Sequence, residues 1–458
     1  MNTDNKMGIV PVKKLLFSMG IPMILCMVLQ AFYNIVDTFF VSNIEGLGDA
    51  ATNALSLAFP VQMLMIAIGV GTGVGINSIL SKSLGAGERE KASLIAGNAV
   101  FLGFCTYLVF LLFGLFGVDW YVASQTDDPV VTELAVKYVR ICTILSFGSI
   151  LSMIYEKLLQ STGKTALSTI MQLAGAIANI VLDPLLIFGL CGLPALGVAG
   201  AAWATVIGQI LTFFLGILFH HAKNKEIDAS FRYLLPKGNI IAAIYRVGFP
   251  AILMQALMSF LVYGVNILFY ARLGADSVTA YGTYYKIQQF VFFAAFGLNN
   301  ALIPLVAFNF GKQERVRVKE SIRYGVLFTM ALMAIGTALA EALAFPLSNL
   351  FGISEDAKAL TRLALRIISV GYVFAGINIA FQGIFQALGF GVRSLLLSLL
   401  RLIAFPLPLA FCLTFAESAS SLVWIAFPVA EALSTIFAFL SYRGLQRKIP
   451  LLKNRAQN

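Results

Sequence analysis

Polar side chains that could exchange one cation for another lie inside long apolar runs of this chain. Asp37 lies toward the end of one such run, and Asn179 and Asp183 lie in another. An ionised side chain at the centre of a bilayer costs about 2.5–3.5 kcal/mol, so each is a functional candidate by default. Asn179 and Asp183 are four residues apart and share one helical face, which can present three oxygens to a cation. Asp37 from a neighbouring helix can supply another.

A hydroxyl could complete this oxygen shell. Thr205 lies four residues after Ala201 in the next apolar run, and hard cations such as Na⁺ prefer oxygen ligands. If Asp37 and Asp183 share a poorly hydrated pocket, both cannot stay ionised cheaply, so one is expected to hold a proton near neutral pH. A bound Na⁺ or a cationic substrate would neutralise the pair equally well. The residues therefore predict exchange between a coupling ion and a substrate.

Each of these residues also has a purely structural alternative. Asp37 could be a capping carboxylate near the outer surface, and Asp183, which precedes Pro184, could mark a helix break. Small residues such as Ala201 and Thr205 pack at helix interfaces without binding anything. The residues alone leave these alternatives open.

The composition excludes soluble classes of protein. Of 458 residues, 59% are apolar and only 12% are charged, and the mean hydropathy is +0.86. Soluble domains carry about 45–50% apolar and about 25% charged residues. Soluble enzymes, disordered chains and disulfide scaffolds are therefore excluded, and the lipid bilayer is the expected surrounding.

Apolar runs of helical length recur along the whole chain. With roughly 20 residues per span plus a connection, the chain has room for about twelve spans, and the runs are too long for β-barrel strands. The first run is also too long for a cleaved signal. Pro22 within it removes a helix hydrogen bond and offers a hinge, or an ordinary kink. The expected spans are 13–41, 50–81, 92–118, 130–162, 165–190, 195–221, 240–271, 277–310, 317–350, 357–388, 393–415 and 418–442.

The net charge is +10, and the basic residues are distributed as in a membrane protein. Basic residues gather in alternate connections, and the intervening connections are acidic or nearly neutral. This positive-inside pattern predicts that both termini are cytoplasmic, and it removes the case for a nucleic-acid partner. An uncleaved multispan chain with short loops favours the inner membrane of a prokaryote. The basic residues include Lys13, Lys14, Lys82, Arg89, Lys91, Lys157, Lys164, Lys223, Lys225, Arg315, Arg317, Arg393, Arg443 and Arg447.

An internal duplication organises the spans. A shift of 226 residues lays Gln62 on Gln288 and Gln160 on Gln386. We expect an N-lobe of residues 1–222, a cytoplasmic linker of residues 223–238 and a C-lobe of residues 239–458. Six spans per copy give both copies the same orientation, so two six-helix lobes related by a pseudo-two-fold axis along the membrane normal are predicted. Such lobes would enclose a cleft suited to alternating access.

A substrate cavity is predicted from soft and aromatic residues, which attract cations and adapt to varied ligands. Packing or contact with lipid is the alternative for each. The amides Gln62 and Gln288 are stronger candidates, because an amide in an apolar span needs a partner. Lys286, Glu341, Arg401 and Glu431 could pair or line the cleft, and the sequence does not choose between these roles. The other cavity candidates are Met254, Met258, Tyr281, Tyr284 and Phe292.

The chain resembles the multidrug and toxic compound extrusion (MATE) family along nearly its whole length. The resemblance rests on the runs Tyr33–Thr38, Gly85–Glu88 and Leu182–Leu185, on Gln160 with Gly163, and on the stretch from Phe381 to Gly389. It implies twelve helices in two lobes and export of amphipathic, mostly cationic compounds in exchange for H⁺ or Na⁺. The family's N-lobe cation site then falls on Asp37, Asn179, Asp183 and Thr205, with Ala201 beside it.

One family pattern is missing. Some branches carry acidic residues in the seventh and tenth helices, whereas residues 248–271 and 367–391 contain none here. The resemblance therefore implies a branch that couples through the N-lobe alone.

Secondary active efflux is the leading function predicted from the sequence, with H⁺ or Na⁺ as the coupling ion, no other cofactor, and a monomer as the expected state. A lipid-linked oligosaccharide flippase is the close alternative, but its cavity should be rich in Arg and Lys. An integral membrane enzyme would need a convergent catalytic set, and the two histidines of this chain, His220 and His221, are adjacent. No catalytic residue is therefore assigned.

Overall fold

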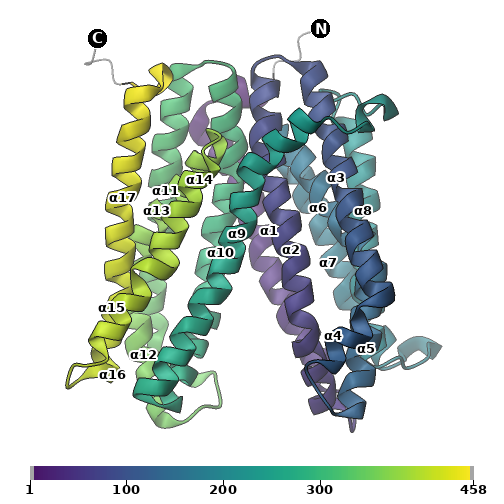
Figure 1. The fold of residues 1–458 in the computed structure, drawn as a ribbon, viewed down its shortest axis with the longest axis vertical. Coiled ribbons are helices and arrows are strands. Elements are labelled where there is room, and N and C mark those ends of the chain that lie inside the picture. The colour runs from purple at the N-terminus through teal and green to yellow at the C-terminus, as the bar shows by residue number, and fades with distance from the viewer. Residues whose placement is uncertain (1–4, 454–458) are drawn as a thin grey trace. The chain divides into compact units, whose positions relative to one another are not determined.

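The computed structural model describes residues 5–453, apart from the side chains of Tyr33, Asn34, Ile35 and Thr38. Most of the Tyr33–Thr38 run therefore lies outside the described side chains. Within the described residues every regular element is a helix. Figure 1 shows these helices as long, mostly upright rods within each half of the chain.

Within residues 5–453, ten helices are long and apolar enough to cross a membrane, and the number rises to twelve when two bent pairs each count as one span. The helices α5 and α6 meet at 44°, and α12 and α13 meet at 56°. The predicted all-α transmembrane fold is thus confirmed, with the fourth and tenth spans broken in the middle. Each break lies at a short turn, after Ile144 and after Ser369.

The helices divide into two compact units. Unit 2 comprises residues 25–245, and unit 1 comprises residues 1–24 together with residues 246–458. The helix α1 (Val12–Ser42) contributes to both units, because the division falls just after Pro22, between Ile24 and Leu25. The expected linker at residues 223–238 precedes the second division, which lies within α9, between Tyr245 and Arg246.

The remaining helices follow in chain order. After η1 (Lys6–Gly8) and α1 come α2 (Gly48–Gly85), α3 (Arg89–Phe116), α4 (Val118–Ala123), α5 (Pro129–Ile144), α6 (Phe147–Ser161), α7 (Thr165–Ile187), η2 (Leu190–Gly192), α8 (Val198–Lys223) and η3 (Phe231–Leu234). Then come α9 (Gly238–Leu273), α10 (Ala275–Gly311), α11 (Arg315–Asn349), α12 (Glu355–Ser369), α13 (Tyr372–Ala387), α14 (Gly391–Leu399), η4 (Leu400–Ala404), α15 (Pro406–Leu413), α16 (Ala419–Leu422), η5 (Val423–Ile425), α17 (Ala426–Lys448) and η6 (Pro450–Leu452).

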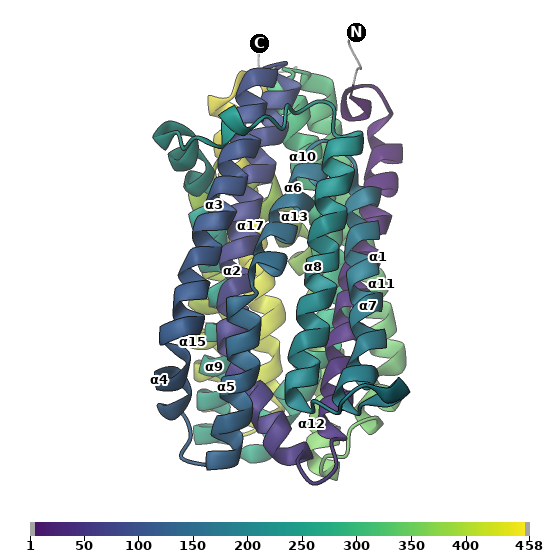
Figure 2. The same cartoon turned by 90° about the vertical axis from the view of Figure 1, so that its right-hand side faces the viewer.

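Glycines bring α7 and α8 of unit 2 close together (Figure 2). A methyl group added at Gly175 would lie 2.7 Å from the carbonyl oxygen of Gly208 and closer still to the Thr212 hydroxyl. One added at Gly200 would lie 2.4 Å from the carbonyl oxygen of Leu186. Small residues let helix backbones approach where no hydrophobic effect drives association within a membrane. This close approach places side chains of α7 against those of α8.

Aromatic side chains fill the core of unit 1. The indole of Trp424 is fully buried and meets the ring of Phe269 edge-on at 5.3 Å between centroids. The rings of Tyr281 and Phe427 stack at 5.6 Å. Between α14 and α15 the backbone forms the π-helical turn η4, and Arg401 lies within it. Such insertions are rare and occur frequently at functional sites.

Candidate functional site

Asn179 lies between an acidic group and a hydroxyl in unit 2. Its side-chain nitrogen is 3.4 Å from Asp183 Oδ1 on the next turn of α7 and 3.3 Å from Thr205 Oγ1 on α8. With the amide turned over, its nitrogen donates to Asp183 Oδ2 at 3.2 Å, and its oxygen accepts from the Thr205 hydroxyl at 3.3 Å. In the second orientation the amide oxygen also accepts from the backbone nitrogen of Thr205 at 3.0 Å. All three side chains are buried, and Asp183 is fully inaccessible.

Asp37 approaches this cluster from α1. Its side chain is 9% exposed, and its charge interacts with that of Asp183. Among the described residues, Asp37 Oδ1 has no hydrogen-bond partner although it is buried. A buried polar atom without a partner costs free energy, so this oxygen is available to a proton or to a cation.

Among the described residues, neither Asp37 nor Asp183 forms an ion pair with a cationic side chain. Elsewhere the same chain pairs its buried acids: Glu156 with Lys157 and Glu431 with Arg401. A buried charge is stable only when it is paired or neutralised. Asp37 on α1 and Asp183 on α7 are thus buried acids without a paired cation among residues 5–453.

Two further predicted residues lie around this cluster. Ala201 is fully buried one turn before Thr205 on α8, and it belongs to the apolar core of unit 2. Gln62 of α2 donates to the Tyr138 hydroxyl at 3.2 Å. Cys142, one turn after Tyr138, interacts with Asp37 and lies within hydrogen-bonding reach of Gln62. Gln62 is thus a neighbour of the acidic cluster in unit 2.

Five of the predicted substrate residues line one cavity, which lies in unit 1. They are Met258, Tyr281, Tyr284, Gln288 and Phe292. The Tyr284 hydroxyl donates to Gln288 Oε1 at 2.6 Å. The cavity holds about 60 Å³, which is room for a few water molecules rather than for a drug-sized ligand.

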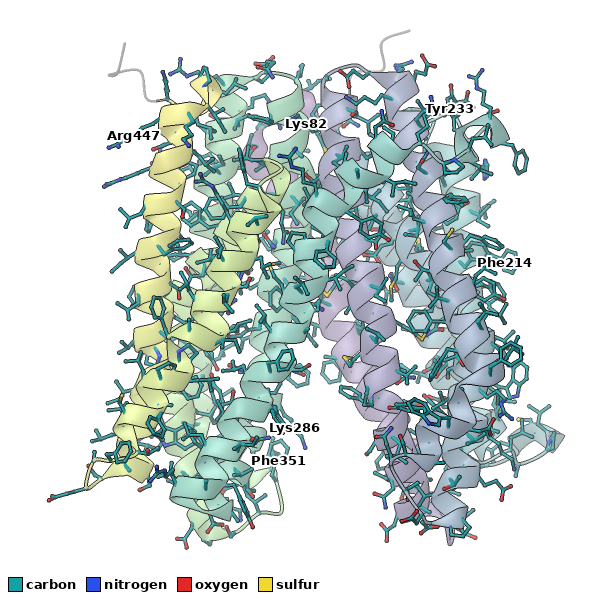
Figure 3. The ribbon with its side chains drawn as sticks, viewed as in Figure 1. Lys82, Phe214, Tyr233, Lys286, Phe351 and Arg447 are labelled. Carbon is teal, nitrogen blue, oxygen red and sulfur yellow. The ribbon has the colours of Figure 1, made fainter. Side chains whose placement is uncertain are left out.

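The other predicted residues lie elsewhere. Met254 is on α9 and accepts a hydrogen bond from the Ser394 hydroxyl at 3.4 Å, outside the cavity lining. Pro22 lies in the part of α1 that belongs to unit 1. Lys286 is exposed on α10 (Figure 3). Glu341, also exposed, accepts from the Ser369 hydroxyl at 3.4 Å.

The sequence left open whether Arg401 and Glu431 pair, and it did not predict the ion pair of Glu156 with Lys157. Arg401 Nε donates to Glu431 Oε1 at 2.6 Å, and both side chains line the cavity of unit 1. In unit 2, Lys157 and Glu156 are 3.3 Å apart, and Gln160 contacts both. Charged residues inside apolar runs indicate that buried ion pairs can form, but the sequence does not identify the partners.

Comparison with known proteins agrees with the duplicated helical fold. The family model MatE matches residues 22–185 and residues 250–412, one match in each half of the chain. The chain belongs to the MatE family. The two matches also support the internal repeat, because the same model fits both halves.

Relatives of this MatE chain cover almost its whole length. The multidrug export protein MepA of Staphylococcus aureus is 26% identical over 94% of this chain and 93% of its own. An outward-facing multidrug resistance MATE family transporter superposes with a TM-score of 0.91, at 24% identity over 99% of this chain and 100% of its own. A MOP superfamily transporter from Pyrococcus furiosus gives 0.89 at 25% identity, with the same coverage. The chain is a multi-pass membrane protein with a transporter fold.

Proposed function

We propose that this protein is a secondary multidrug exporter that moves amphipathic, mainly cationic compounds out of the cell in exchange for H⁺ or Na⁺. The supporting observation is the pair Asp37 and Asp183, two buried and electrostatically coupled carboxylates without a counter-cation among residues 5–453. Such a pair binds one positive charge strongly and releases it when another replaces it. Two relatives, the multidrug export protein MepA and a multidrug resistance MATE family transporter, support multidrug export.

The coupling site consists of Asp37, Asn179, Asp183 and Thr205, with Ala201 packed beside them. The carboxylates supply charge, and the amide and hydroxyl oxygens complete a shell that suits a hard monovalent cation. Proton binding at either carboxylate would serve equally well. A substrate and a coupling ion that favour different states of the protein exchange through alternating access.

The protein is proposed to act as a monomer in the cytoplasmic membrane with both termini in the cytoplasm. The alternation of basic and acidic connections supports this orientation. A lipid-linked oligosaccharide flippase is less well supported, because the only basic residue in the cavity lining of unit 1 is Arg401, and Glu431 already neutralises it.

Transport by purified protein in liposomes tests the proposal. Efflux of ethidium, a fluorescent amphipathic cation, is followed under a pH gradient alone and under a Na⁺ gradient alone. We expect one gradient to drive efflux above the level of protein-free liposomes, and its identity names the coupling ion. Absence of gradient-driven efflux under both conditions, with correctly inserted protein, would refute the function.

A further inference from the structure

In the cavity of unit 1, both carboxylate oxygens of Glu431 accept a hydrogen bond. Glu431 Oε1 accepts from Arg401 Nε at 2.6 Å, and Oε2 accepts from the Asn378 amide at 2.7 Å. The Thr435 hydroxyl lies 3.2 Å from the Asn378 side-chain oxygen and 2.9 Å from the backbone carbonyl oxygen of Glu431. The side chain of Arg401 is 4% exposed. The buried guanidinium of Arg401 is thus held on a partly buried carboxylate that also accepts a hydrogen bond from the neutral Asn378 amide.

The internal repeat relates this pair to the acidic cluster of unit 2. The offset that lays Gln160 on Gln386 lays Thr205 of α8 on Glu431 of α17. The two helices also share the burial pattern, since Ala204 and Gly208 are buried as are their counterparts Ala430 and Ser434. Each unit therefore has an oxygen-bearing side chain at the same position of its last long helix.

The same offset explains why an arginine fits only in unit 1. The counterpart of Arg401 is Gly175, whose close approach to α8 leaves no space for even a methyl group. In unit 1 the π-helical turn η4 begins just before Arg401, and α14, α15 and α17 pack around it (Figure 1). The Arg401 side chain and the π-helical turn thus occupy the position that corresponds to the close contact between α7 and α8 in unit 2.

The surroundings of Arg401 suit a planar cation. Its guanidinium carbon is 5.6 Å from the centroid of the Phe292 ring, which is within range of a cation–π interaction. Tyr281, Tyr285 and Phe427 form more of the cavity wall. Only one hydrogen bond from the guanidinium, through Nε, occurs among the described residues. Aromatic faces and one carboxylate select a weakly hydrated, delocalised cation over Na⁺, which requires several oxygen ligands.

We propose that Glu431 is a monovalent-cation site of unit 1 and that the guanidinium of Arg401 is its tethered occupant. Unit 2 takes its positive charge from solution, whereas unit 1 carries its own. Removing the Arg401 side chain then opens a site for free guanidinium-type cations. The binding site stands apart from export, but its consequence, that unit 1 needs no coupling ion, rests on the proposed function.

Binding of methylguanidinium to purified full-length Arg401→Ala tests the site. Thermal unfolding is followed while methylguanidinium chloride is increased at constant ionic strength, with urea as the neutral planar control. We expect a saturable rise in melting temperature for Arg401→Ala and an apparent affinity at least tenfold weaker, or none, for the wild type. Arg393→Ala, which removes a different arginine of unit 1, should behave as the wild type.

The carboxylate is tested in the same assay. The double variant Arg401→Ala/Glu431→Gln should lose the saturable effect, because the charge that binds the cation is gone. Retention of the effect in the double variant, an equal effect of urea, or no saturable effect in folded Arg401→Ala would each overturn the proposal. If Arg401→Ala aggregates, the membranes are extracted with methylguanidinium, with urea, or without either compound. Recovery of monodisperse protein only in the presence of methylguanidinium supports the site. Equal recovery with urea, or failure of methylguanidinium to improve recovery, overturns it.

The liposome assay separates this inference from the proposed function. Methylguanidinium binding without any export by the wild type would retain the site and refute the exporter. Export by the wild type without methylguanidinium binding to Arg401→Ala would retain the exporter and refute the site.

Discussion

The amide of Asn179 bridges α7 and α8, because it lies 3.3 Å from the Thr205 hydroxyl and contacts Asp183 on its own helix. The contact therefore lies at the interface of α7 and α8, where glycines allow the two backbones to approach closely. The neighbouring acid Asp37 lies on α1, the helix that contributes to both units.

Replacing either acid should abolish coupling without unfolding the protein. Asp37→Asn and Asp183→Asn keep the side-chain shape but remove the negative charge that binds the exchanging cation. We expect gradient-driven ethidium efflux to fall at least about tenfold, which corresponds to about 1.4 kcal/mol of cation binding. Asp49→Asn, at the exposed start of α2, is the matched control and should export normally. Wild-type rates in both cluster variants would remove the site from unit 2.

The Thr205 hydroxyl should contribute to affinity rather than to coupling itself. Thr205→Val keeps the branched shape and removes the hydroxyl, whereas Thr205→Ser retains it. One hydrogen bond contributes about 0.5–1.5 kcal/mol, so the valine variant should need about two- to tenfold more coupling ion for half-maximal efflux. The serine variant should stay near the wild type. Equal half-saturation in all three proteins would show that the hydroxyl does not contact the ion.

Gly175 should be intolerant of any side chain. In Gly175→Ala the new methyl group would lie 2.7 Å from the Gly208 carbonyl oxygen, so α7 and α8 must separate. Overpacking of this kind costs about 1–3 kcal/mol, and we expect a lower melting temperature in detergent together with slower efflux. Gly282→Ala is the control, because no heavy atom lies within 4 Å of the added methyl group. Equal melting temperatures in both variants would contradict the close helix contact.

The ion pair of Lys157 with Glu156 in unit 2 should stabilise the fold. Lys157→Met leaves Glu156 buried and unpaired, apart from neutral amides such as Gln172, whose nitrogen donates to it at 2.7 Å. Loss of one partner of a buried pair costs about 3–5 kcal/mol, so the single variant should melt far below the wild type. Glu156→Gln/Lys157→Met should regain most of the stability. A double variant no more stable than the single one would show that Lys157 acts through packing alone.

Local periodicity explains what could be predicted of the site. Asn179 and Asp183 meet because residues four apart on a helix are neighbours, and that relation follows from the chain itself. Hydropathy likewise located the spans, although it did not reveal that the fourth and tenth are bent at Ile144 and Ser369. A bend in an apolar run leaves the average hydropathy unchanged.

Relations between distant helices could not be predicted in the same way. Arg401 and Glu431 are thirty residues apart, and each had several possible partners until α14, η4 and α17 packed together. Met254 lies one turn before Met258 on the same side of α9, but it contacts Ser394 of α14 and does not line the cavity. Composition says which side chains are available, whereas the direction of each depends on how its helix packs.

The amino-acid sequence by itself determined that this is a duplicated, all-helical membrane chain with a few charges inside its spans, because bilayer thickness and the cost of burying charge act on local composition. Only the tertiary structure decided which of those charges are paired. In unit 1 the backbone makes room for an arginine beside its acid, and in unit 2 glycine packing excludes one. Asp37 and Asp183 consequently have no paired cation among the described residues of unit 2.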